Sequence, residues 1–211
     1  KECELMVYWS SDPESQFGAY GGTESSERRL WAKELGIKTV HINPHYSPTA
    51  AFTGGKWLPI RPGTDTAMAM AIMHVWLAEG LYDREFVEQR TTGFDEWCAY
   101  LRGEVDGVAK TPKWQEVETG IAARDVRALA REWGRKKTYL GCGVNGGGFG
   151  GACRNASGIQ WARAMVMMMA MQGWGRPGVN FGNLSNGTPV DLETYFPGYG
   201  EGGISGELAA T

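Results

Sequence analysis

Short apolar segments alternate with longer helical patterns along most of this chain, and that alternation decides the class of fold. Strand-like segments occur at Leu5–Trp9, Lys38–Ile42, Thr138–Cys142 and, shorter, at residues 57–60. Amphipathic or apolar helical patterns cover residues 23–35, 66–79, 122–133 and 156–172. Strands joined through helices run parallel with right-handed crossovers. The sequence therefore predicts an α/β fold, a Rossmann-like three-layer sandwich with a mainly parallel sheet.

The domain organisation follows from where this periodicity stops. The 211 residues, 42% of them apolar, are enough for one substantial core. We expect residues 1–182 to form a dinucleotide-cofactor-binding α/β domain. Residues 183–211 are rich in glycine and aromatic residues without a period, which predicts a loop-rich tail leading to a neighbouring domain. We therefore expect the sequence to be a fragment of a longer subunit.

Charge and cysteine spacing exclude several function classes. The net charge of −3 gives no basic footprint for nucleic acid. The four cysteines lie far apart without a Cys-x-x-Cys pair, so neither a zinc site nor an iron–sulfur cluster is expected. No apolar run reaches the ~18 residues needed to span a bilayer, so direct membrane insertion is not expected. The compartment stays open, either cytoplasmic or exported.

Polar residues follow each predicted strand, at the edge where ligands bind parallel sheets. We expect these strand-end residues to meet across that edge, with backbone N–H groups free for a ligand. They are Ser10, Ser11 and Asp12 after Trp9; His41, Asn43 and His45 around the end of the second strand; Arg61, Gly63 and Asp65 after the third; and Cys142, Gly143 and Asn145 at the end of the fourth.

Asp65 is the strongest single candidate in this set. It follows a Pro62-Gly63 turn and directly precedes an apolar helical run. One carboxylate can accept hydrogen bonds from the ring N–H and the exocyclic amino group of guanine together, an arrangement that adenine does not offer. The alternative is that Thr64 or Asp65 simply caps the helix. For Arg61, contact with cofactor phosphates and a merely extended surface position are equally compatible with the sequence.

The glycine-rich segment after the fourth strand contains G-x-G-x-x-G twice between Gly141 and Gly151. Alone, this motif would suggest a nicotinamide or flavin dinucleotide site, but no acidic residue ends a second strand roughly 20 residues further on. The sequence contains no recognisable hydrolase motif such as G-x-S-x-G. The chain thus shows cofactor-binding features, and we expect no catalytic residue or metal ligand in it.

Four segments carry a family resemblance that covers most of the chain. In order, "VYWSSDP", "VHINPHYSPTA", "WLPIRPGTDTAMAMAIMHVWLAEGLYDREFV" and "GVNFGNL" resemble the large subunit of the molybdopterin guanine dinucleotide oxidoreductases, the dimethyl sulfoxide reductase family. The resemblance implies that the strand-end loops hold part of a molybdopterin guanine dinucleotide, with Trp9 in the first loop and with Cys142, Asn145 and Arg154 as polar contacts of the glycine-rich loop. Asn43 stands where many members have Asp, which removes the charge-assisted part of that contact.

The motifs "VYWSSDPES", "GAYGGTES" and "GNLSNGTPVDLETYFPGYGEGGISGE" look most similar to the branch of pyrogallol–phloroglucinol transhydroxylase and catechol dehydroxylases. This implies a full-length enzyme with molybdenum or tungsten, two pterin guanine dinucleotides and a small aromatic substrate such as a catechol or pyrogallol. It also implies a metal ligand from a preceding segment, the remaining domains of the large subunit as partners, and an iron–sulfur subunit as a further one. The fragment alone would be inactive. The alternative from another class is a stand-alone nucleotide-binding module without catalysis.

Overall fold

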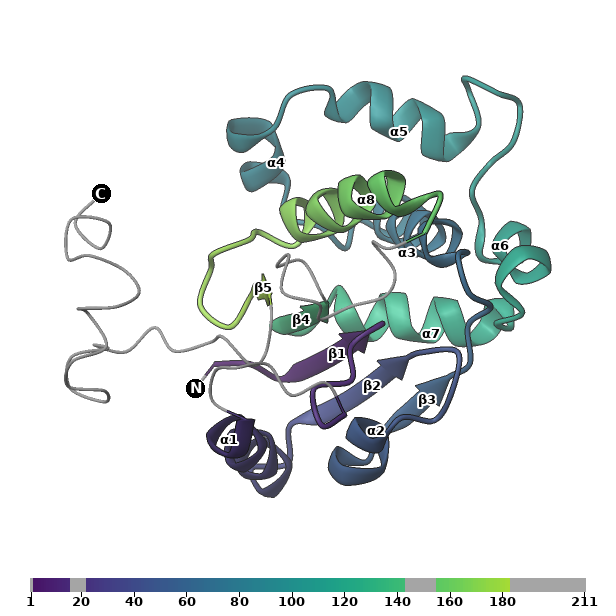
Figure 1. Ribbon diagram of the computed structural model, residues 1–211. Helices are drawn as coiled ribbons and strands as arrows, with labels where there is room; N and C mark the ends of the chain where they lie inside the picture. Colours follow the sequence, from purple (N-terminus) through teal and green to yellow (C-terminus); the bar gives the residue numbers. More distant parts are fainter. Residues whose placement is uncertain (1, 16–21, 143–154, 183–211) are drawn as a thin grey trace, which may run out of the picture.

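The computed structural model of the chain describes residues 2–15, 22–142 and 155–182, and the description below is confined to them. These residues form an α/β sandwich around one sheet (Figure 1). The five described strands are β1 (Leu5–Trp9), β2 (Lys38–Ile42), β3 (Lys56–Leu58), β4 (Thr138–Cys142) and β5 (Asn180–Gly182). They are ordered β3-β2-β1-β4-β5, and every neighbouring pair is parallel. The predicted fold class is confirmed.

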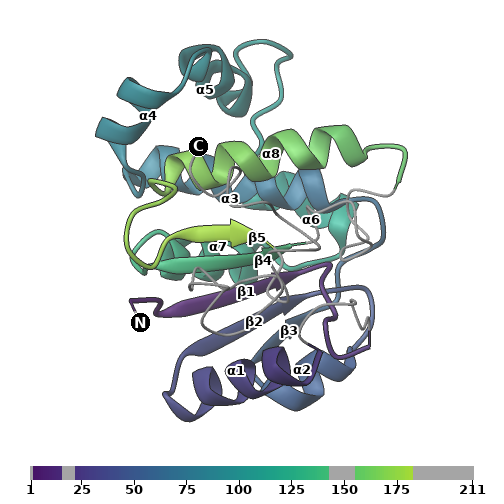
Figure 2. The same cartoon turned by 60° about the vertical axis from the view of Figure 1, so that its left-hand side comes forward.

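Helices cover both faces of the sheet (Figure 2). On one face lie α1 and α2, and on the other lie α3, α7 and α8, with α4 and α5 packed outside that second layer. The described helices are α1 (Gly22–Glu34), α2 (Pro48–Thr53), α3 (Asp65–Glu79), α4 (Arg84–Arg90), α5 (Phe94–Arg102), α6 (Pro112–Thr119), α7 (Ala123–Trp133) and α8 (Gly158–Met171). The direction of winding reverses between β1 and β4, because the chain moves outward from β1 through α1 and from β4 through α8 on opposite faces.

Local signals in the sequence set most helix ends. Asp83 and Thr111 cap α4 and α6 by accepting from the N–H groups of Phe86 and Trp114. Gly80 and Gly120 end α3 and α6 in the left-handed conformation that glycine adopts without a steric penalty. A residue of the local sequence therefore fixes each of these four helix ends.

The core is centred on α3, which contacts α5, α6, α7 and α8. Because α3 is surrounded on several sides, its apolar residues are spread around the helix rather than along one stripe. Four tryptophans, Trp9, Trp76, Trp133 and Trp161, are the largest fully buried or nearly fully buried side chains. The methionines of α8 fill the space between helix and sheet, as expected for flexible thioether side chains.

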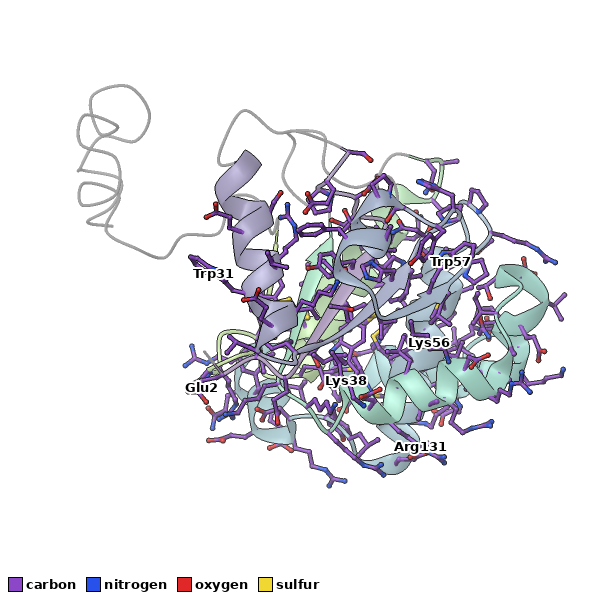
Figure 3. The ribbon with its side chains drawn as sticks, turned by 90° about the horizontal axis from the view of Figure 1, so that it is seen from below. Glu2, Trp31, Lys38, Lys56, Trp57 and Arg131 are labelled. Carbon is purple, nitrogen blue, oxygen red and sulfur yellow. The ribbon has the colours of Figure 1, made fainter. Side chains whose placement is uncertain are left out.

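Ion pairs connect β2 and β3 to α7. The Lys38 Nζ atom lies 2.9 Å from Glu132 Oε1, and the Lys56 Nζ atom lies 2.6 Å from Asp125 Oδ1. Figure 3 shows both lysines on the side of the molecule occupied by α7. These pairs are exposed, so we expect them to fix the strand-to-helix packing with little net stabilisation.

Candidate cofactor site

The reversal of winding between β1 and β4 defines where a ligand fits this sheet. Trp9 is opposite Ile42 on one side and Cys142 on the other, so three strands end at the same level. Open parallel sheets bind ligands in the crevice beyond the strand ends at such a switch point. The strand-end residues predicted from the sequence therefore start from adjacent positions, as expected.

Ser10, the first residue after β1, holds an uncommon backbone conformation. Its φ of 50° makes it the one non-glycine residue with positive φ in the described part of the chain. Its N–H donates to the carbonyl of Ile42 at 2.8 Å, which fastens the turn to β2. Left-handed serine costs free energy and persists where surrounding contacts determine it, often at ligand sites.

Trp9 and Asp65 form the central contact of the site. The indole Nε1–H of Trp9 donates to Asp65 Oδ1 at 2.9 Å, across 56 positions of sequence. Trp9 is 0% exposed and Asp65 is 5% exposed. Burial raises the pKa of Asp65, and the hydrogen bonds from Trp9 and from its own backbone N–H oppose that rise. A buried carboxylate is stable only when hydrogen-bond donors surround its oxygens, so Asp65 at the sheet edge favours a ligand that donates hydrogen bonds.

The turn before α3 bears on whether Thr64 or Asp65 only caps the helix or whether Asp65 binds a ligand. Thr64 makes no side-chain cap to the helix, and its hydroxyl donates to the carbonyl of Arg61 at 2.7 Å. Gly63 has a φ of 79°, and a side chain added there would meet nothing within 4 Å. The Pro-Gly turn is therefore unobstructed at Gly63 and leads directly into the first turn of α3.

The Arg61 side chain makes hydrogen bonds within the domain. Its Nη1 donates to the carbonyls of Val117 and Glu118 at 2.7 and 3.4 Å, at the end of α6. A cation at a helix C-terminus is favoured by the helix dipole. The side chain is exposed, and contact with cofactor phosphates stays a prediction.

Asp12 connects the loop after β1 to the start of α2. Its Oδ1 accepts from the backbone N–H of Thr49 at 3.0 Å and from the Thr49 hydroxyl at 2.6 Å. The N–H of Glu14 in turn donates to the Thr49 hydroxyl at 3.0 Å, and Glu14 pairs with the buried Arg29 of α1. Asp12 thus positions the loop, and its pairing with Thr49 could not be predicted from the sequence because 37 positions separate the two.

Asn43 holds the loops after β1 and β2 together. Its Nδ2 atom lies 3.4 Å from the carbonyl oxygen of Ser11, and its own carbonyl accepts from the Trp57 indole at 2.9 Å. Asn43 is 4% exposed and Ser11 is 7% exposed. A carboxylate could not donate to the Ser11 carbonyl, so the asparagine suits this contact.

The two histidines beside Asn43 differ in environment. His41 is 0% exposed, stacks on Tyr8 with ring centroids 4.8 Å apart, and its Nε2 lies 2.9 Å from the carbonyl oxygen of Gly54. Burial lowers its pKa. These contacts favour the structural interpretation of His41. His45 is exposed in the loop after β2, and its contact with a nucleotide stays a prediction.

The predicted contacts Gly143, Asn145 and Arg154 lie outside the described residues, as does the side chain of Cys142. Within the described ranges, no cluster of three or more His, Cys, Asp or Glu side chains is arranged to hold a metal ion. No described helix is long and apolar enough to cross a membrane. The described part of the edge offers both buried and exposed hydrogen-bonding groups at the ends of adjacent strands.

Comparison with known proteins identifies the relatives of this chain. No family model matches it. Over 98% of its length the chain is 49% identical to the pyrogallol hydroxytransferase large subunit of Pelobacter acidigallici, of which it covers 24%. It is 34% identical over 98% of its length to dimethyl sulfoxide/trimethylamine N-oxide reductase of Cereibacter sphaeroides, of which it covers 25%. The solved structure of acetylene hydratase from Pelobacter acetylenicus shares the fold, with a TM-score of 0.68 at 20% identity over 84% of this chain and 22% of that one.

These similarities, together with the α/β sheet, identify the chain as part of a protein of the molybdopterin oxidoreductase class. The chain belongs to the dimethyl sulfoxide reductase family of that class. It spans about a quarter of the length of the curated relatives it matches.

Proposed function

We propose that this chain holds the guanine end of a molybdopterin guanine dinucleotide in a molybdenum or tungsten enzyme that acts on an aromatic polyol. Asp65 receives the base, and the loops after β1, β2 and β4 border the rest of the nucleotide. When bound, the metal–pterin group supplies the redox or oxygen-transfer chemistry. The residues of this chain bind and orient it.

The observation that carries the proposal is the position of the Asp65 carboxylate. It is buried at the switch point and bonded to an indole of the central strand, whereas Thr64, at the cap position of α3, makes no side-chain cap. A carboxylate that only stabilised the helix end would gain by staying in water, since burial raises its pKa. The adjacent N–H donors of guanine would compensate this burial.

The substrate class rests on the relative with 49% identity, whose name states that it is a pyrogallol hydroxytransferase. A catechol or pyrogallol ring is therefore the substrate class that we propose for the full-length enzyme. The remaining domains of a large subunit and an iron–sulfur subunit are the partners that this proposal implies.

Cofactor analysis of the full-length subunit tests the assignment. Acid hydrolysis of the purified subunit should release guanosine monophosphate in proportion to its bound molybdenum or tungsten. Asp65→Asn should reduce this retention, because the amide presents an NH₂ group toward the guanine donors and keeps one acceptor. The expected loss is about 1–3 kcal/mol of binding free energy for a charged hydrogen bond.

A matched control separates recognition from helix stabilisation. Asp83→Asn alters another aspartate at a helix start, one whose carboxylate accepts from the Phe86 N–H of α4. It should leave the guanine content unchanged. Equal guanine content in wild type and Asp65→Asn would contradict the proposal.

A further inference from the structure

The Trp9 side chain is closely packed by its surroundings. Its ring lies at the end of β1 with a centroid 4.5 Å from that of Trp161 on α8, at an interplanar angle of 42°. Both rings are buried, at 0% and 2% exposure. Packing against α8 therefore restricts the rotation of the indole, and the direction of its N–H is fixed before any ligand arrives.

That fixed donor meets only one of the carboxylate oxygens of Asp65. The Nε1–Oδ1 distance of 2.9 Å is that of a well-formed N–H···O hydrogen bond. An aspartate side chain without this contact rotates about two bonds, whereas the contact fixes its plane. The indole thereby leaves Oδ2 and the second lone pair of Oδ1 available to the two guanine donors.

We propose that Trp9 is the positioning residue for nucleobase recognition, holding Asp65 ionised and oriented so that its carboxylate selects guanine. This inference rests on the proposed function of Asp65. Trp9 acts through Asp65 and needs no contact with the base, which distinguishes it from the cofactor contacts in the strand-end loops.

Loss of the Trp9 hydrogen bond changes the pKa of Asp65 in one direction. Burial raises the pKa of Asp65, and the Trp9 hydrogen bond and the residue's own backbone N–H lower it. Among the described residues, no charged side chain contributes to this balance. Removing the indole N–H therefore raises the pKa further, so the carboxylate protonates at a higher pH. A protonated carboxyl presents an O–H to guanine donors and loses selectivity.

The chain offers a matched control for this test. Trp76 is also 0% exposed, and its Nε1–H donates to the Ala130 carbonyl at 2.7 Å, in the core between α3 and α7. Trp76→Phe therefore makes the same change in volume and removes an equally buried hydrogen bond. It does so without touching Asp65. Any effect common to both variants reports packing and not recognition.

The experiment uses the full-length subunit and measures guanosine monophosphate released per metal after gel filtration at several pH values. At pH 7, the guanine dinucleotide content of Trp9→Phe should be at most one fifth of that of Trp76→Phe. On acidification, Trp9→Phe should begin to lose the cofactor at a higher pH than wild type does. Where Trp9→Phe fails to fold, β-(3-benzothienyl)alanine at position 9 replaces the N–H by sulfur with nearly the same shape, and the same two changes are expected.

Two results would overturn the inference, and they are distinguishable. If both position-9 variants keep wild-type guanine content and pH profile while Asp65→Asn loses the dinucleotide, Asp65 recognises guanine without help from Trp9. If Asp65→Asn also keeps the dinucleotide, the proposed function of Asp65 itself fails, and the positioning role fails with it.

Discussion

Asp12 and Thr49 join the loop after β1 to the first turn of α2 through two hydrogen bonds on a single carboxylate oxygen, at 3.0 Å from the Thr49 N–H and 2.6 Å from its hydroxyl. Ser47, the N-cap residue of α2, accepts from the N–H of Ala50 at 3.2 Å. The start of α2 therefore depends on one local cap and one cap from a distant loop. The loop after β1 is held in place by the same contact.

We expect Asp12→Ala to destabilise the chain by about 1–3 kcal/mol, because two buried donors lose their acceptor. Asp95→Ala, at an exposed position in the first turn of α5, provides the comparison and should have little effect. Urea unfolding of the two variants at pH 7 measures the difference. Equal midpoints would mean that water replaces the carboxylate at the start of α2.

The Asp12 contact also predicts a pH dependence. Burial raises the pKa of Asp12, but hydrogen bonds from Thr49 and Ser15 outweigh burial and leave the pKa below its ordinary value. A depressed carboxyl pKa gives stability that is complete above the unfolded value, about 3.9, and is lost as the pH falls through the folded value. The difference in free energy of unfolding between wild type and Asp12→Ala should therefore become smaller below about pH 4.

His41 predicts a second pH dependence in a different range. Its pKa is lowered by burial, so the folded chain keeps the ring neutral while the unfolded chain protonates near pH 6.5. The stabilisation is complete above about pH 6.5 and is lost as the pH falls from there through the folded pKa. His41→Gln retains an amide donor for the Gly54 carbonyl but does not titrate, so it should flatten the stability profile between about pH 5 and 7.

His74 is the matched comparison for that measurement, because burial also lowers its pKa. We expect His74→Gln to remove a separate part of the pH dependence of stability. The double variant should remove the contributions of both histidines. A profile for His41→Gln that parallels wild type would show that His41 does not contribute to the acid sensitivity.

Much of the fold was predictable from local patterns. The bounds of β1, β2 and β4 match the sequence prediction because each is an apolar run ended by polar or glycine residues. The third strand was expected at residues 57–60, but it ends at Leu58 because Pro59 has no N–H for the ladder. Helix α2 has only six residues and no helical period, but Ser47-Pro48 carries the same cap-and-proline signal as Thr111-Pro112. Strand β5 was also missed, since three residues give no periodicity.

The sequence predicts that the strand-end residues lie at one edge of the sheet, but it does not predict their contacts. Parallel strands bring their polar ends to one edge, and this follows from the order of elements alone. The partner of each side chain does not follow from that order, because Trp9 meets Asp65 across 56 positions and Asp12 meets Thr49 across 37. Such pairs depend on the three-dimensional packing of α3 and α2 against the sheet.

Lys110 carries a stability prediction outside the site. This lysine is 2% exposed, its Nζ donates to Asp106 Oδ2 at 2.5 Å and to the Val108 carbonyl at 2.6 Å, and it lies 4.4 Å from the ring centroid of Tyr100. Lys110→Met keeps the aliphatic stem but removes the ammonium. We expect a loss of about 1–3 kcal/mol, because the ammonium contributes charged hydrogen bonds and a cation–π contact.

The comparison for Lys110 is Lys113→Met, whose lysine is 80% exposed and paired with Glu116. An exposed pair of this kind contributes little, so its unfolding midpoint should stay near wild type. If the two variants unfolded together, the segment between α5 and α6 would hold its shape without the buried cation.

Finally, we predict that the 211-residue chain shows no molybdenum-dependent turnover by itself. It spans about a quarter of its curated relatives, and its strand-end residues lie at one edge of one sheet. Catalysis requires the reacting atoms to be enclosed and oriented, which we expect the remaining domains of the subunit to provide. An assay with a reduced dye and catechols should give the buffer rate for the purified chain and turnover for the full-length subunit assayed beside it. Turnover by the chain alone, scaling with its bound metal, would show that the quarter represented here is sufficient for the reaction.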